Sequence, residues 1–244
     1  MRVSVYLVAF LAFASSALAQ FEGVIEMKMT ATSAAGQETM TATMVNSIKG
    51  ASFRGETSTS VGGTVIKQIM LLRGSEPNKI YMLNPDTKTY TEMDIASMTD
   101  AMTQSDEDYE VKKVGSEKIL GYNCTRVQVK WKKSQLTMEM WTTKDVLDWA
   151  TYVRMQNNPA LRNNKLATAL RNAGADGMAL KVVSETQDGG KNIMEVVKVE
   201  RKAVPASLFE IPKDYKKSEG MFGIPGMTKE KMQEMMKQMK KQQN

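Results

Sequence analysis

The chain has 244 residues, of which 42% are hydrophobic, 7% aromatic and 25% charged, and 33 Lys+Arg against 27 Asp+Glu give a formal net charge of +6. These proportions are typical of a globular chain with one large domain or two small ones. The sequence contains no His, which excludes Ser-His-Asp and Cys-His catalysis and His-ligated metal sites, and its single Cys excludes an intramolecular disulfide.

The first residues predict a secretory signal peptide over 1–19. Arg2 supplies a positive charge, the apolar run after it is too short to span a bilayer, and Ala17-Leu18-Ala19 has the small-x-small pattern of a cleavage site. We expect cleavage after Ala19 and a mature chain that starts at Gln20. The alternative is an N-terminal anchor that is retained. A signal of this length is typical of bacterial export, so the expected location is the periplasm.

Alternating apolar and polar residues dominate the chain after residue 20 and predict half-buried antiparallel strands. The first run places five residues on one face: Phe21, Gly23, Ile25, Met27 and Met29. Similar alternation recurs over Met40–Met44, Val127–Trp131, Leu136–Met140 and Ile193–Val199. We expect roughly nine to eleven strands, at the spacing of a sandwich, a barrel or a strongly curved sheet.

Turn sequences predict hairpins between several of these runs, because Asn, Asp and Gly adopt the backbone angles that tight turns need. The turns that we expect are Asn84-Pro85-Asp86-Thr87 between Lys79–Leu83 and Lys88–Met93, Asp188-Gly189-Gly190 between Leu180–Gln187 and Asn192–Lys202, Gly62-Gly63, and a short connection bracketed by Gly115 and Gly121.

Two segments have helical spacing instead. Over 144–157 the apolar residues are Val146, Trp149, Ala150 and Val153. After Asn158 and Pro159, which have the character of an N-cap and a first helical residue, the spacing is repeated by Leu166, Ala169, Leu170 and Ala173, and Gly174 predicts the end of the helix. A third, short helix is expected over 94–104, with Ile95, Met98 and Met102 on one side. Helices inserted between strands must bury their apolar stripes on the sheet, which predicts an α+β fold that is mainly β.

The C-terminal region differs from the body. Residues 218–227, with three Gly and one Pro between Gly220 and Gly226, predict a linker, and 228–244 predict an amphipathic helix with Lys opposite Met232, Met235, Met236 and Met239. A free helix of about 17 residues is marginal in water, so this tail is expected to fold when it docks on a membrane surface or a protein partner. Cu(I) binding by the thioethers is the third interpretation.

Three stretches resemble an exported bacterial family that is catalogued only as a domain of unknown function, number forty-four twelve: Asn78–Asp94 (NKIYMLNPDTKTYTEMD), Lys113–Thr125 (KVGSEKILGYNCT) and Ala206–Tyr215 (ASLFEIPKDY). The most specific pieces are Gly-Tyr-x-Cys at 121–124 and Leu-Phe-Glu-Ile-Pro at 208–212. That family is similar in turn to the Lol-type lipoprotein carriers and receptors. The resemblance therefore implies a curved antiparallel half-open β-barrel over 20–217, with a helical lid above an apolar cavity, and it implies no catalytic residues.

Methionine is the most distinctive residue type, with 21 in the chain. Met27, Met29, Met40, Met44, Met70, Met82, Met138 and Met140 fall in predicted strands. Such residues form either a plastic apolar surface that repacks around flexible ligands or an ordinary core with Met in place of Leu. The residues predicted to line a cavity between the sheet and the helices are Met27, Met29, Met138, Met140, Trp149, Leu166 and Leu170.

Other reactive residues give weaker signals. Cys124 is expected to be a buried or half-buried thiol, and 106–110 is an acidic cluster without calcium-loop spacing, expected to be a solvated loop. Glu26 and Glu139 could serve as an acid–base pair, although polar strand faces commonly carry Glu.

The sequence thus predicts a periplasmic, non-catalytic binding protein for an apolar small molecule, lipid, acyl chain or lipoprotein, without a cofactor or a bound metal. Nucleic acid is not an expected partner, because basic residues are not gathered with aromatic ones on one face. The alternatives are a Met-rich Cu(I)-binding protein and a protein-interaction or chaperone-like module.

Overall fold

The computed structural model describes residues 21–95, 109–132, 136–156, 165–186, 188–218, 220–221 and 224–225. Most of the described chain forms one twelve-stranded sheet with the order β12-β6-β5-β4-β3-β2-β1-β11-β10-β9-β8-β7. Its strands are β1 (Glu22–Thr32), β2 (Glu38–Lys49), β3 (Ser52–Val61), β4 (Thr64–Leu72), β5 (Lys79–Asn84), β6 (Thr89–Asp94), β7 (Tyr109–Ile119), β8 (Tyr122–Trp131), β9 (Thr137–Thr143), β10 (Met178–Glu185), β11 (Lys191–Arg201) and β12 (Lys216–Lys217).

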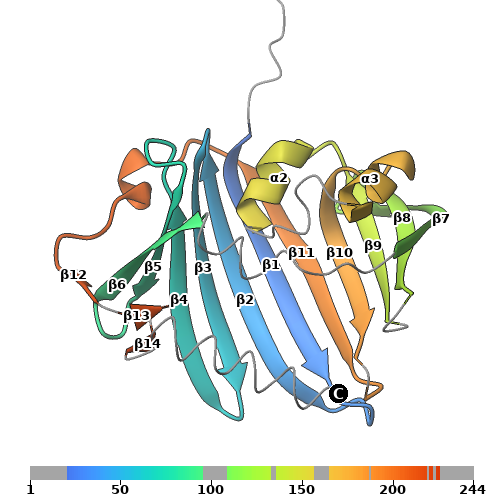
Figure 1. The fold of residues 1–244 in the computed structure, drawn as a ribbon, viewed down its shortest axis with the longest axis horizontal. Helices are drawn as coiled ribbons and strands as arrows, with labels where there is room; N and C mark the ends of the chain where they lie inside the picture. Colours follow the sequence, from blue (N-terminus) through green and yellow to red (C-terminus); the bar gives the residue numbers. More distant parts are fainter. Residues whose placement is uncertain are drawn as a thin grey trace, which may run out of the picture.

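The sheet consists of two meanders that meet in the middle. Strands β1 to β6 pair in chain order, β7 to β11 do the same, and β11 pairs with β1. All these pairs are antiparallel, whereas the short β12 runs parallel to β6. Among the described strands β7 and β12 are the edges, so the sheet is curved but open (Figure 1). The expected α+β, mainly β, half-open fold is confirmed, and a two-sheet sandwich and a closed barrel are not found.

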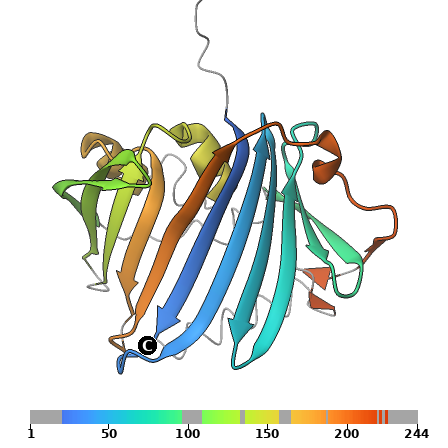
Figure 2. The ribbon, with the colours of Figure 1, turned by 180° about the vertical axis from the view of Figure 1, so that it is seen from behind.

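Two described helices, α2 (Trp149–Gln156) and α3 (Lys165–Asn172), cover one face of this sheet near one end of its strands (Figure 1). From behind, the central strands lie in front of them (Figure 2). Neither helix has the length and the apolar stretch needed to cross a bilayer. Eleven of the strands in this sheet have six or more residues, in agreement with the expected nine to eleven, and the two-residue β12 is too short for alternation to reveal.

The hairpin turns follow the predicted chemistry, with one exception. The Oδ1 atom of Asn84 accepts the N–H groups of Asp86 at 3.0 Å and Thr87 at 3.1 Å, and the turn between β3 and β4 has positive φ at Gly62 and Gly63. The expected connection from Gly115 to Gly121 is wrong. Residue 115 lies inside β7, where the register with β8 shifts, and only Leu120 and Gly121 form the turn.

Helix α2 begins five residues later than the predicted start at 144. The carboxylate of Asp148 is its N-cap: Oδ1 accepts the N–H of Thr151 at 2.9 Å, and the Thr151 hydroxyl donates to Oδ2 at 2.7 Å. Val146 is buried but precedes the helix.

Helix α3 ends as predicted, with Gly174 at φ +69°. The N–H of Ala175 donates to the Leu170 carbonyl at 2.8 Å, as in a Schellman motif. The expected cap at 158–159, most of the helix over 94–104, the signal peptide and the tail 228–244 lie outside the described residues.

The main apolar core lies between the sheet and the two helices, and a smaller cluster lies on the opposite face of β4 and β5. The smaller cluster contains Ile69, Leu71, Tyr81 and Leu83, packed against Tyr90, Ile211 and Tyr215. Residues 202–218, which include the 3-10 helix η2 (Ala206–Phe209), thus form a C-terminal strap over the outer face of the sheet. Beyond the strap, the short strands β13 (Gly220–Met221) and β14 (Ile224–Pro225) pair with each other within the expected linker.

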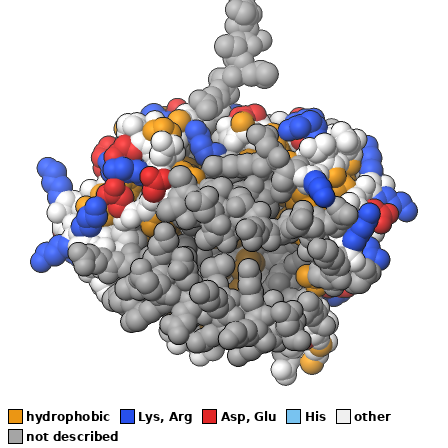
Figure 3. Space-filling view, viewed as in Figure 1, with side chains coloured by type: hydrophobic (Ala, Val, Ile, Leu, Met, Phe, Trp, Pro, Cys, Tyr) orange, Lys and Arg blue, Asp and Glu red, His pale blue; other side chains and the backbone are white. Residues whose placement is uncertain are grey.

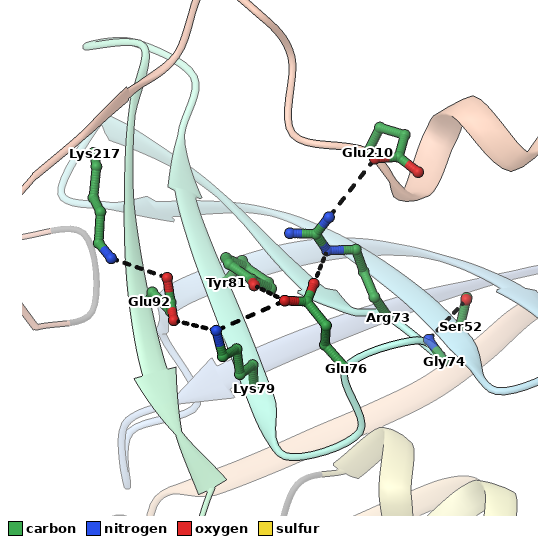
Figure 4. A network of polar contacts seen from close by, with 9 residues as sticks. All are labelled: Ser52, Arg73, Gly74, Glu76, Lys79, Tyr81, Glu92, Glu210 and Lys217. Carbon is green, nitrogen blue, oxygen red and sulfur yellow. Dashed lines mark hydrogen bonds and ion pairs between the residues drawn. The ribbon is translucent and has the colours of Figure 1, made fainter.

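Ion pairs fasten the C-terminal strap to the sheet (Figure 4). Arg73 lies 3.7 Å from the Glu210 carboxylate, and Glu92 contacts Lys79 at 2.7 Å and Lys217 at 3.0 Å. Hydrogen bonds hold the pKa of Glu92 below its ordinary value, and the one from Lys79 contributes more than the one from Lys217. The Leu-Phe-Glu-Ile-Pro motif at 208–212 therefore helps to attach the C-terminal strap to the sheet, because Phe209 is buried and Glu210 pairs with Arg73.

Candidate functional site

A hollow opens on the face of the sheet that carries α2. Its volume is about 230 Å³, and it is lined by eleven residues, six of which are methionines: Met27, Met44, Met70, Met82, Met155 and Met194. The others are Asn46, Phe53, Gly55, Thr57 and Gln68. Met155 comes from α2 and the rest from six neighbouring strands, so the helix forms one wall and the curved sheet the remainder.

Strand register explains why these residues meet. Directly opposed residues of an antiparallel pair share a face, and alternate residues along each strand do the same. One row across the sheet runs Met27, Met44, Thr57 and Gln68, and the next runs Asn46, Gly55, Met70 and Met82. Both rows face α2, and together they supply eight of the eleven lining residues.

Gly55 lies at the centre of the second row, between the side chains of Phe53 and Asn46. A Cβ atom at this position would lie 2.9 Å from Cζ of Phe53 and 3.1 Å from Oδ1 of Asn46. The phenyl ring and the amide already crowd the position, so a larger residue would force one of them to move. Gly55 is therefore required by close packing, and its missing side chain deepens the hollow.

Asn46 is the most deeply buried polar residue of the lining, with 6% of its surface exposed. Its Nδ2 atom donates to Sδ of Met27 at 3.1 Å. A thioether is a weak acceptor, so this contact satisfies the amide less well than an oxygen would. An amide in this position can exchange that contact for a stronger one when a carbonyl or hydroxyl oxygen enters the hollow.

None of the eleven lining residues is charged. Figure 3 views the molecule from this side, and hydrophobic side chains are visible near its centre. Glu26 and Glu139, the acid–base candidates, alternate with inward-facing residues and so lie on the other face. Glu26 pairs with Lys198 at 3.4 Å, and Glu139 with Arg126 at 2.7 Å, so the structure does not bring the two carboxylates together.

The predicted lining residues occupy several environments. Met27 lines the hollow, and Met29 follows it on β1 opposite Met194. The remaining predicted residues pack in or against the main core: Met138, Met140, Trp149, Leu166 and Leu170. Leu170 is fully buried on α3. Contact between a ligand and any of these side chains stays a prediction.

The sequence interpretation did not select several residues that line the hollow. Met44, Met70 and Met82 were recognised as strand methionines but were not assigned to the site, and Asn46, Gly55, Met155 and Met194 were not singled out. Period-two alternation from Met44 would have found Asn46. In β11 the expected alternation over 193–199 is wrong, because the register with β1 shifts between Glu26 and Met27. Met194 and Val196 therefore face the core, whereas Val197 is 51% exposed. No local pattern indicates Gly55, because its role depends on residues in neighbouring strands.

Cys124 does not belong to the hollow. It is buried, as expected, and desolvation raises the pKa of its thiol above the ordinary value. Its Sγ atom donates to the Tyr122 carbonyl at 3.7 Å. Within the part of the chain that the structure describes, no group of three or more Cys, Asp and Glu side chains is placed to hold a metal ion. In the acidic cluster only Tyr109 and Glu110 are described, at the start of β7.

Comparison with protein families gives one match. The family described as "Domain of unknown function (DUF4412)" matches residues 21–215, which confirms the resemblance found in the sequence. No curated protein matches the chain.

Solved structures give more distant likenesses. MucB in its complex with MucA(peri) is 11% identical with a TM-score of 0.38, and the match covers 79% of this chain and 55% of that one, so the chain spans about half of MucB. A DUF1329 family protein from Desulfovibrio piger is 12% identical, with a TM-score of 0.33 and coverages of 79% and 90%. An outer membrane lipoprotein-sorting protein domain from Vibrio parahaemolyticus is 11% identical, with a TM-score of 0.34 and coverages of 78% and 89%.

Proposed function

This chain belongs to the DUF4412 family, and we propose that it is a non-catalytic binding protein whose methionine-lined hollow takes an apolar ligand, such as a lipid or the acyl chain of a lipoprotein. The observation that carries the proposal is the hollow itself, about 230 Å³ between the sheet and α2. The predicted signal peptide supports a periplasmic location.

Methionine suits such a wall. Its unbranched side chain has three rotatable bonds and a polarizable sulfur, so it adapts to ligands of different shape at little cost. The adjoining core is built differently. The row next to the hollow contains Ile48, Leu72 and Ile80, each no more than 4% exposed, and Phe53, which also lines the hollow. The change from branched residues in that row to methionine in the rows of the hollow favours a binding surface over an ordinary core.

Binding would proceed by burial of apolar surface, at about 25 cal/mol per Å², without a covalent step. The hollow is smaller than the 300–1,000 Å³ typical of pockets for drug-sized ligands, so it would take one segment of a chain and leave the rest outside. Met155 on α2 would contact the ligand from the side opposite the sheet.

Lipid extraction tests the proposal. The full chain, expressed with its leader in a bacterial host and purified from the periplasm, is analysed by native mass spectrometry and, after solvent extraction, for lipids. We expect a co-purifying lipid that is lost in Thr57→Phe, which fills the hollow, and retained in Thr41→Phe, which adds the same ring to the outer face. A wild-type protein free of lipid that also fails to bind the apolar dye Nile red would refute the proposal.

Soft-metal binding is the second candidate function, because six thioethers line one hollow and thioethers favour Cu(I). An anaerobic Cu(I) titration of the full chain tests it. If the hollow is the site, Met70→Leu with Met82→Leu lowers the stoichiometry, whereas Met138→Leu, outside the hollow, leaves it unchanged. Equal stoichiometry in all three proteins would show that the hollow is not a copper site.

A further inference from the structure

We infer that the hollow selects an uncharged amphiphile, an acyl ester, over the anion of a free fatty acid. This inference rests on the proposed function and adds the chemical class of the ligand. It follows from two features of the sheet. The first is the polarity of successive rows of side chains on the face that carries the hollow, called here the concave face. The second is the placement of the charged side chains of β3 and β4 on the other face.

The rows that cross the concave face change in polarity along the strands. Ile48, Phe53 and Leu72 close one end and are buried. The next row contains Asn46 and Gly55 beside Met70 and Met82, and the row after it ends in Thr57 and Gln68, which oppose each other across β3 and β4. An amphiphile would therefore place its chain toward Phe53 and its polar group toward Thr57 and Gln68.

On β3 and β4, strand alternation turns the charged neighbours of this polar end away from it. Glu56 and Lys67 are the sequence neighbours of Thr57 and Gln68, and they point to the opposite face. There they line a groove that Thr57 and Gln68 also border. On α2, Arg154 precedes Met155, but its Nη2 atom donates to the Gly50 carbonyl at 3.1 Å, at the turn between β2 and β3. Among the eleven lining residues, only amide and hydroxyl groups offer polar contacts.

These groups match an ester better than a carboxylate. An ester carbonyl accepts hydrogen bonds from an Asn or Gln amide or from a Thr hydroxyl and carries no charge to desolvate. A carboxylate in the same place loses water without gaining a cation, so it binds weakly or takes up a proton. An unpaired neutral polar group costs about 1–3 kcal/mol in proteins, roughly fivefold to 150-fold in affinity, and an unpaired charged group costs more.

The test compares two probes with the same chain, dodecanoate and the glycerol monoester of dodecanoic acid, by displacement of Nile red from the full-length protein. At about pH 8 the ester is expected to bind at least about tenfold more tightly. The difference should narrow below about pH 5, as the free acid takes up a proton. Gln68→Lys, which supplies a cation at the polar end, should improve dodecanoate binding about tenfold, and Thr41→Lys, which adds the same charge to the outer face, should not.

Each outcome decides one of the two proposals. Equal affinity of both probes at about pH 8 overturns the selectivity and leaves the binding function standing. Failure of Gln68→Lys to improve dodecanoate binding, in a protein that still binds the ester, also overturns it. If neither probe displaces the dye from wild-type protein, the apolar-ligand function falls and the selectivity falls with it.

Discussion

Substitution of Thr57 by Phe discriminates between an unfilled hollow and a packed core. Thr57 is half-buried, lies in the middle of β3, and lines the hollow opposite Met44 and Gln68. In a packed core an added ring would force neighbours to shift, at a cost of about 1–3 kcal/mol. Where space is available, the same ring gains contacts. We therefore expect Thr57→Phe to raise the free energy of unfolding while it abolishes binding of an apolar ligand.

The size of the gain follows from the volume of the hollow. An enclosed cavity costs about 24 cal/mol per Å³, so 230 Å³ sets an upper limit of about 5.5 kcal/mol. A cavity of about 150 Å³ holds benzene, so a phenyl ring fits. A fully buried Phe contributes about 1.5–3 kcal/mol, and a hollow that is open on one side buries about half of the ring. The expected increase in the free energy of unfolding is about 1 kcal/mol.

Urea unfolding monitored by circular dichroism, combined with Nile red binding, measures both effects. Thr41→Phe, on the outer face of β2, is the matched control, and it should leave dye binding intact with a stability change within about 0.5 kcal/mol. A Thr57→Phe protein that is destabilised by more than 1 kcal/mol and still binds the dye would show that residue 57 faces packed core and that ligands bind elsewhere.

Three further predictions concern the helices that cover the sheet. Leu170→Ala should lower the free energy of unfolding by about 2–5 kcal/mol in urea titration, because Leu170 is fully buried. Gly174→Ala should cost about 1 kcal/mol in the same assay, entirely from the backbone, since φ is +69° and no atom lies within 4 Å of the added methyl group. Asp148→Ala should cost about 1 kcal/mol at neutral pH through loss of the N-cap. Burial raises the pKa of Asp148, but hydrogen bonds from Thr151 and Ala150 hold it below the ordinary value overall. In thermal unfolding, the wild-type protein should therefore have a higher Tm than Asp148→Ala above about pH 4. This difference in Tm should vanish as the pH falls through the lowered pKa.

Local sequence patterns were sufficient for the strands and for most of their turns. Alternation identified β1 and β8 because each has one buried face. Asn84 indicated the turn between β5 and β6 through its side-chain hydrogen bonds, and Gly62 indicated the turn between β3 and β4 through its positive φ. The start of α2 was misplaced because apolar spacing extended over Val146, and the capping carboxylate of Asp148 was the signal that would have corrected it.

The hollow could not be predicted in the same way. Its position depends on Gly55 being opposite Asn46 on one side and Met70 on the other, and strand register of this kind is set by the whole sheet. The C-terminal strap is a similar case. The apolar positions of β4 that face it, such as Leu71, alternate with equally apolar residues that face the core, so period two could not indicate which face is covered.

One arrangement accounts for both the stability of the sheet and the neutrality of the hollow. Because side chains alternate along each strand, Glu56 and Lys67 are held on the outer face for the same reason that Thr57 and Gln68 are held on the inner one. A shift of one residue in the pairing of β3 would turn Glu56 toward α2, and it would also expose Phe53, which is 4% exposed in the native register. The energy that fixes the register therefore also keeps the charges of β3 and β4 out of the hollow. On these two strands a charge enters the hollow by substitution of an inward-facing residue. Gln68→Lys, and not a charge on the outer face, is therefore the change expected to alter ligand preference.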